Sequence, residues 1–60
     1  MLIEIKVEEV KVTTKPRTWY TGILLCDGVE IYRSKSRPYR SCARALAVQE
    51  RADREKRDEL

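Results

Sequence analysis

Apolar and charged residues alternate along the first part of the chain with the period of two that is typical of a β-strand. Ile3, Ile5 and Val7 alternate with charged neighbours, and beyond position 9 the apolar residues move to even positions. A period-two pattern that slips by one residue indicates a β-bulge, which we expect near Glu8–Glu9. The many β-branched residues favour a strand over a helix. Residues 2–13 are therefore predicted to form the first strand, antiparallel to the second.

The middle of the chain, residues 19–32, has the pattern of a β-hairpin. Two runs rich in β-branched and aromatic residues flank the dipeptide Asp27-Gly28. This dipeptide is a strong signal for a type I′ turn, because both central residues of that turn have a positive φ. The predicted register places Cys26 opposite Val29, Leu24 opposite Ile31, and Ile23 opposite Tyr32.

Both faces of the predicted hairpin are apolar. One face carries Tyr20, Leu24, Cys26, Val29 and Ile31. An antiparallel sheet that is solvated on one side has one apolar and one polar face, so we expect each face of this hairpin to be covered. The residues of the second face are the candidate dimer interface: Trp19, Ile23, Leu25 and Tyr32.

The last third of the chain has the pattern of a loop followed by a helix. Residues 34–41 are polar and include Pro38, which predicts a loop. Ser41 is the expected N-cap, since its hydroxyl can accept a backbone N–H of the first turn. Gly22, in the middle of the second strand, indicates either a bulge or a close approach by this helix. The stripe expected to face the sheet follows helical spacing and contains Cys42, Ala45, Leu46, Gln49 and Ala52. This apolar surface is widened by Ala43, Ala47 and Val48, and so many alanines would let the helix lie close to a sheet.

The predicted fold class is α+β, with a three-stranded antiparallel sheet and one C-terminal helix in the order β-β-β-α. Residues 1–53 form this single domain, and residues 54–60 form a charged helix end that is solvated or frayed. A chain of 60 residues buries only about 60% of its unfolded surface, so small domains often gain stability from oligomerisation. We therefore expect a homodimer in which free sheet faces or edge strands meet.

Positive charge is concentrated in the middle of the chain. The net charge is +3, but residues 11–44 hold eight Lys and Arg against two acidic residues. Five of these basic residues fall within positions 33–44, around the loop between the third strand and the helix. Lys15 and Arg17 precede the second strand, whose start the hairpin brings near the end of the third. We expect the basic residues to share one edge of the fold.

A surface of this kind suits the phosphates of nucleic acid. The planar guanidinium of Arg donates two hydrogen bonds to a phosphate, and a helix N-terminus adds backbone donors and a favourable dipole. Tyr39, Tyr32 and Trp19 are candidates for stacking on bases. The candidate nucleic-acid-binding residues are Lys15, Arg17, Arg33, Lys35, Arg37, Tyr39, Arg40 and Arg44. No base-reading element is visible, so we expect little sequence preference.

These patterns leave two kinds of function open. The first is a small, non-enzymatic interaction module that acts as a homodimer. The alternative is a protein that binds DNA or RNA weakly through the basic loop. If the basic loop is only a solvated loop, or if the protein is an interaction module, no binding to a DNA or RNA duplex is expected. Duplex binding therefore discriminates between these functions.

Enzymatic and cofactor chemistry are not expected. The chain has no His for acid–base catalysis at neutral pH. With two Cys and no His, no metal site is expected. Cys42 has no evident base beside it and is interpreted as a packed side chain. We expect no disulfide between Cys26 and Cys42, because the hairpin separates them by roughly 20 Å. No cofactor or small-molecule substrate is therefore predicted.

The sequence also predicts a cytoplasmic location. Charges interrupt the first residues where a signal peptide would be apolar, and no apolar run approaches the length of a membrane span. The final tetrapeptide 57–60 is similar to an ER-retention signal, which we interpret as coincidence without an entry signal. In this compartment the cysteines would be reduced.

A pattern of Trp, Gly and Ala resembles that of known small domains. The spacings are Trp19-x3-Ile23-x4-Gly28-x2-Ile31 and Ser41-x3-Ala45-x6-Ala52. They resemble the three-stranded-sheet-plus-helix DNA-binding domains, which include the Apetala-type plant domain and the arm-binding domain of phage recombinases. The resemblance covers residues 19–52 and implies a sheet that lies in the major groove with a helix behind it.

Two further likenesses concern the whole element order. The order β-β-β-α is similar to the second half of double-stranded RNA-binding domains. The chain also resembles small bacterial and prophage-like proteins of unknown function that have a Trp-containing strand, a Gly turn and a helix. That last likeness implies a dimer-prone cytosolic module.

Overall fold

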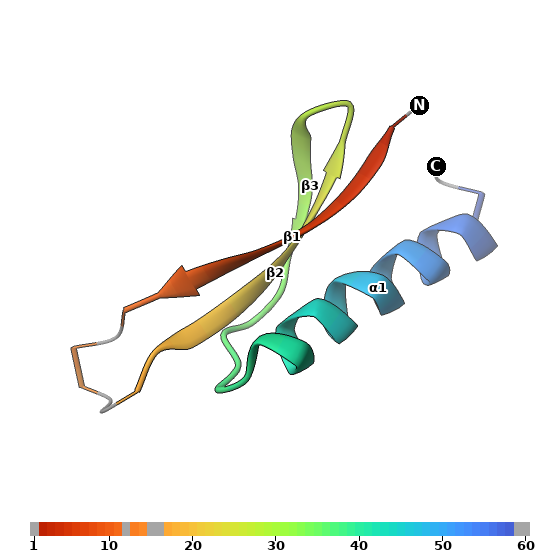
Figure 1. Ribbon diagram of the computed structural model, residues 1–60. Coiled ribbons are helices and arrows are strands. Elements are labelled where there is room, and N and C mark those ends of the chain that lie inside the picture. Colours follow the sequence, from red (N-terminus) through yellow and green to blue (C-terminus); the bar gives the residue numbers. More distant parts are fainter. Residues whose placement is uncertain (1, 12, 15–16, 59–60) are drawn as a thin grey trace.

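The protein folds as one antiparallel sheet with a helix along one face, in a computed structural model that describes residues 2–11, 13–14 and 17–58. The elements are β1 (Ile3–Val10), β2 (Trp19–Cys26), β3 (Val29–Arg33) and α1 (Arg40–Lys56). The strand order is β1-β2-β3, so β2 is central. Figure 1 shows α1 running beside the sheet, in the opposite direction to β1. The predicted α+β class and β-β-β-α order are confirmed.

The turn between β2 and β3 has the predicted geometry. Asp27 has a φ of 51° and Gly28 a φ of 83°, the two positive values that a type I′ turn requires. Cys26 lies opposite Val29, as predicted. The Asp27 carboxylate also accepts a hydrogen bond from the backbone N–H of Leu2, at 2.8 Å, which ties the turn to the start of β1.

Beyond the turn, the predicted hairpin register is wrong by one residue. Leu25 lies opposite Glu30 and Leu24 opposite Tyr32, so Ile31 is the extra residue of a bulge. The Ile31 carbonyl accepts a hydrogen bond from the Arg54 guanidinium, at 3.1 Å. The bulge therefore lies at a contact with α1 that no local pattern in the hairpin reveals.

The register between β1 and β2 is continuous from Ile3 to Val10, so the predicted bulge at Glu8–Glu9 is wrong. Glu9 stays on the same face as the apolar residues before it and lies opposite Tyr20. There its carboxylate pairs with the Arg40 guanidinium, at 3.2 Å. The change in the polarity pattern thus marks an ion pair with α1, since the strand itself remains regular.

Gly22 is the point where α1 approaches the sheet most closely. A Cβ atom added at Gly22 would collide with the backbone of Ala43 and would lie 3.2 Å from the Cβ of Ala47. Ala43 and Ala47 are fully buried, as is Leu24 two residues further along β2. The core is therefore thin, and only small residues fit between helix and strand.

This close approach determines which side of α1 faces the sheet: the alanines that widen the predicted apolar surface are buried, whereas most of the predicted stripe is not. The buried residues are Ala43 and Ala47, with Leu46 half-buried beside them. The other members of the predicted stripe are exposed: Cys42, Ala45, Gln49 and Ala52. The predicted N-cap is also wrong, because the N-cap is Tyr39, without a side-chain capping bond, and Ser41 lies exposed in the first turn.

The C-terminal part of α1 is anchored to the sheet beyond residue 53. Arg54 is half-buried, donates to Glu50 at 2.7 Å and also donates to the Ile31 carbonyl. The regular helix continues to Lys56. The structure therefore places Arg54 in the packed domain, where the sequence predicted the start of a solvated end; residues 59–60 of that predicted end lie outside the described residues.

The sheet face opposite α1 is covered by charged side chains of the same chain. The Arg33 guanidinium on β3 lies 3.2 Å from the Glu8 carboxylate on β1 and 2.9 Å from that of Glu30. Because β2 lies between β1 and β3, this ion-pair bridge crosses the central strand. Beneath it, Ile23 is 2% exposed and Thr21 is 3% exposed. The long side chains thus cover much of the second apolar face.

Candidate nucleic-acid interface

A basic surface forms where α1 begins and β2 starts. The backbone groups of Tyr20 and Arg37 form two hydrogen bonds, each 2.7 Å long. Residues paired in this way on antiparallel segments share a face, so Arg37 lies on the α1 face with Tyr20. The short segment 38–39 then leads directly into the helix at Arg40.

Two Arg–Tyr stacks order the guanidinium groups at this surface. The Cζ atom of Arg40 lies 5.0 Å from the centre of the Tyr20 ring, and that of Arg17 lies 5.1 Å from the centre of the Tyr39 ring. Both distances fit cation–π contacts. A side-chain hydrogen bond to Tyr39 raises the pKa of Arg17. The stacks join residues that lie far apart in the sequence.

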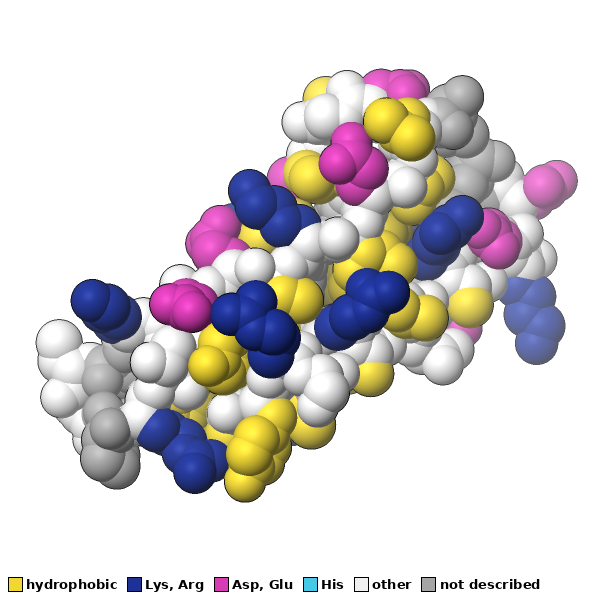
Figure 2. Space-filling view, in the orientation of Figure 1, with side chains coloured by type: hydrophobic (Ala, Val, Ile, Leu, Met, Phe, Trp, Pro, Cys, Tyr) yellow, Lys and Arg dark blue, Asp and Glu magenta, His cyan; other side chains and the backbone are white. Residues whose placement is uncertain are grey.

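We define the basic end as the following set: Arg17, Arg37, Tyr39, Arg40 and Arg44. Figure 2 shows dark blue side chains beside exposed hydrophobic ones over the part of the molecule where α1 begins in Figure 1. Tyr39 is 57% exposed. Lys35, also exposed, lies two residues before Arg37 in the chain. Tyr20 and Glu9, which the sequence did not single out, complete the surroundings of Arg40.

Charge neutralisation divides the predicted basic residues into two groups. Arg33 pairs with two glutamates on the face opposite α1, which raises its pKa and lowers that of Glu30. Arg40 pairs with Glu9. Within the described part of the chain, no ion pair links Arg17, Arg37 or Arg44 to an acidic side chain. Arg33 therefore lies apart from the basic end, and Lys15 is outside the described residues.

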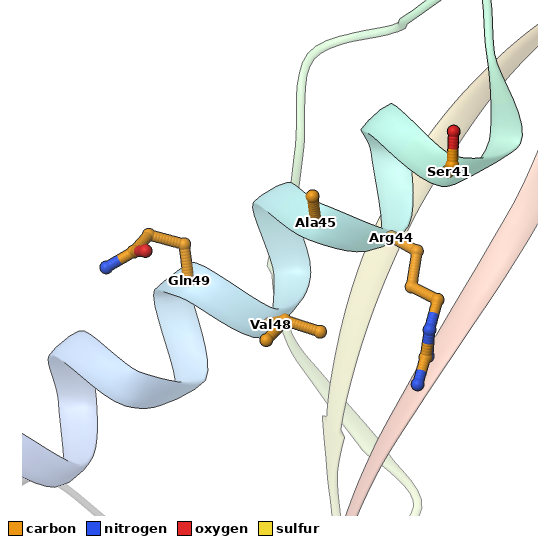
Figure 3. A pocket seen from close by; sticks show the side chains of 5 residues that line it. All are labelled: Ser41, Arg44, Ala45, Val48 and Gln49. Atoms are coloured by element: carbon orange, nitrogen blue, oxygen red, sulfur yellow. The ribbon is translucent and has the colours of Figure 1, made fainter.

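Arg44 borders a shallow hollow on the outer side of α1. The hollow is lined by Ser41, Arg44, Ala45, Val48 and Gln49. Figure 3 shows Ser41, Ala45 and Gln49 in one row and Arg44 and Val48 in the next. The first turn of α1 also has no acidic residue. The start of the helix thus presents positive charge and uncapped backbone donors together.

The four candidate residues of the dimer interface do not form one exposed surface. Ile23 is buried beneath the ion-pair bridge, and Trp19 and Leu25 are half-buried. Tyr32 lies opposite Leu24 and so belongs to the face of α1. The bulge at Ile31 is the reason, because it shifts Tyr32 from the face where the regular register would put it.

Other kinds of site find no support in the described residues. They contain no cluster of three or more Cys, Asp or Glu that could hold a metal ion. Cys26 is a half-buried free thiol and Cys42 an exposed one. No helix in this part of the chain has the length and apolar character needed to cross a membrane.

Comparisons with protein family models, with curated proteins and with solved structures return no match to this chain. The assignment of a function therefore depends on the geometry of the basic end and of the sheet.

Proposed function

We propose that the protein is a small nucleic-acid-binding module that contacts the phosphate backbone through its basic end. The observation that carries this proposal is the arrangement of two Arg–Tyr stacks beside two further Arg side chains without acidic partners in the described chain. Ordered, charged guanidinium groups on one surface match a row of phosphates.

The individual groups at the basic end have complementary tasks. Arg37 and Arg44 are available for phosphate contacts. Arg40 holds an exposed ion pair with Glu9, and such pairs contribute little to stability, so exchange of the carboxylate for a phosphate costs little. The exposed ring of Tyr39 offers a surface on which a base or sugar can stack.

The contacts are expected to be largely independent of sequence. Phosphate contacts position a protein on nucleic acid but carry no base information. The sheet face opposite α1 carries Glu4, Glu8 and Glu30 against Lys6 and Arg33, so it offers no net positive charge for docking in a groove. The proposed surface is therefore the start of α1, and differs from the sheet surface used by the DNA-binding domains that the sequence resembles.

Binding of a short mixed-sequence duplex at low salt, followed by fluorescence anisotropy, tests the proposal. The variant Arg17→Glu with Arg44→Glu removes two guanidinium groups that have no acidic partner among the described residues, and we expect it to lose at least about tenfold in affinity. The matched control, Arg51→Glu with Lys56→Glu, makes the same change in net charge on the distal half of α1 and should bind nearly as the wild type does. Equal losses in the two variants would contradict a specific role for the basic end.

The second candidate function is a homodimeric interaction module. The observation that favours it is the open edge of β1, since the sheet face first expected to form the interface is covered within the chain. Under this alternative, duplex binding would be absent and self-association would be the functional property.

A further inference from the structure

The outer edge of β1 is the longest unpaired strand edge in the described chain. β1 has eight residues, and the strand order leaves one of its sides without a neighbour, as Figure 1 shows. An edge of this kind presents a row of backbone N–H and C=O groups that can pair with another strand.

The hydrogen bonds of the sheet show which residues of β1 face outward. Tyr20 and Gly22 bond to Arg37 and Ser34 on the β3 side, so the alternate residues of β2 bond to β1. In agreement, the Leu2 carbonyl accepts from the N–H of Asp27. The residues of β1 whose backbone groups point away from β2 are therefore Ile3, Ile5, Val7 and Glu9.

The two edges of the sheet differ in how well they are protected. β3 has five residues and a bulge, and its Ile31 carbonyl already accepts a hydrogen bond from the Arg54 guanidinium. Short strands, bulges and covering side chains are the usual protection against strand pairing. β1 has no bulge and no Pro, and its regular register extends over its whole length. Its edge is thus open to a partner.

We infer that β1 pairs antiparallel with β1 of a second copy of this chain, about a two-fold axis at Ile5. This register places Ile3 opposite the partner's Val7 and Ile5 opposite the partner's Ile5. It also places Glu4 opposite the partner's Lys6, and by symmetry this pair occurs twice. Apolar residues thus meet on the face of α1, and opposite charges meet on the other face.

Other registers fit less well. A shift that centres the axis on Lys6 keeps the hydrogen-bond phase, but it would bring two Lys6 side chains together and place Glu4 opposite the partner's Glu8. A shift to Val7 would place Ile5 opposite the partner's Glu9. The hydrogen-bond phase thus allows each of these registers, and the side-chain pairs select the one centred on Ile5.

Pairing in this register also covers apolar surface. α1 lies mainly over β2, and Ile3, Ile5 and Val7 remain half-buried. The second copy would cover the free sides of these residues and form a continuous six-stranded sheet with both helices on one face. Glu9 lies four residues from the axis, so the two basic ends would be separated by roughly 26 Å along the strands.

Charge exchange tests this interface, with sedimentation at high micromolar protein concentration as the readout. The wild type should sediment at twice the chain mass of 7.1 kDa. Glu4→Lys or Lys6→Glu alone replaces two attractive pairs by two repulsive ones, and should weaken the dimer at least about tenfold. The double variant restores both pairs and should restore the dimer. Lys11→Glu, which lies outside the paired segment, should leave it intact.

Amide hydrogen exchange gives a second, independent readout. The amides of Ile3, Ile5 and Val7 should become more protected as protein concentration rises, whereas those of Glu4 and Lys6 should be protected at every concentration. A monomeric wild type, or a dimer that survives both single variants, would overturn the inference. Because none of the variants touches the basic end, this result is independent of the result for nucleic-acid binding.

Discussion

Ser34 directly follows β3 and bonds to Gly22, the residue of β2 that lies against α1. Its hydroxyl accepts the N–H of Gly22 at 2.8 Å and donates to the Lys35 carbonyl at 3.0 Å. Its own N–H donates to the Gly22 carbonyl, at 2.8 Å. The backbone N–H of Gly22 is buried beneath α1, where it needs a hydrogen-bond acceptor. The hydroxyl of Ser34 supplies that acceptor.

Replacing Ser34 by Ala is expected to lower the free energy of unfolding by about 1–3 kcal/mol, because it leaves the buried amide of Gly22 without an acceptor. The matched control is Ser36→Ala, at an exposed position of the same segment, with an expected effect within about 0.5 kcal/mol. Urea unfolding monitored by circular dichroism measures both values. Similar values for the two variants would show that the hydroxyl of Ser34 makes no special contribution.

Individual residues also show what the sequence can and cannot predict. Asp27 and Gly28 specify their turn by local backbone chemistry, so the turn was predictable. Ser34 lies in a polar run and looks like any solvated residue. The bulge at Ile31 is in contact with Arg54, which is distant in the sequence. No local pattern shows these last two features, whereas the small size of Gly22 did indicate a close approach by the helix.

At the scale of the elements, the ion-pair bridge holds all three strands together on the face opposite α1. Arg33 on β3 reaches Glu8 on β1 across the central strand and also binds Glu30. Hydrogen bonding to Arg33 lowers the pKa of Glu30 below its ordinary value of 4.5. A carboxylate whose pKa is depressed by folding stabilises the fold above its ordinary pKa, and this contribution disappears as the pH falls through the lowered value.

The variant Glu30→Gln should therefore be less stable than the wild type at pH 7, and the difference should shrink as the pH falls below about 4.5. Chemical unfolding at a series of pH values measures the two stabilities. Glu55→Gln is the control, because Glu55 pairs with Arg51 along the exposed side of α1, away from the sheet. A difference between wild type and Glu30→Gln that stays constant with pH would contradict the role of the Glu30 charge.

The elements themselves were predictable, but the residues of α1 that pack against the sheet were not. Alternation, the turn dipeptide and the helical spacing of apolar residues correctly indicated three strands and a helix. The sequence predicted an apolar surface of α1 centred on the stripe from Cys42 to Ala52, whereas the structure buries Ala43 and Ala47, which only widen that surface. Contact with Gly22 requires the smallest side chains, and this steric requirement outweighs the number of apolar residues on the other side.

At the scale of the whole molecule, the surfaces have distinct characters. The basic end carries guanidinium groups without acidic partners in the described chain, the face opposite α1 carries the ion-pair bridge, and β1 leaves an open edge. The sequence predicted that basic residues would gather near the start of the helix. It did not show that Glu8 and Glu9 would neutralise Arg33 and Arg40, because that depends on the register between β1 and β2.

The central claim is that the basic end binds phosphates, and the salt dependence of duplex binding tests it most directly. Each neutralised phosphate contributes a slope of about −0.9 to log affinity against log salt. For three or four contacts, the wild type should show a slope between about −2.7 and −3.6, and Arg17→Glu with Arg44→Glu should show a slope shallower by about 1.8. A slope near zero for the wild type, or the same slope for both proteins, would contradict the claim.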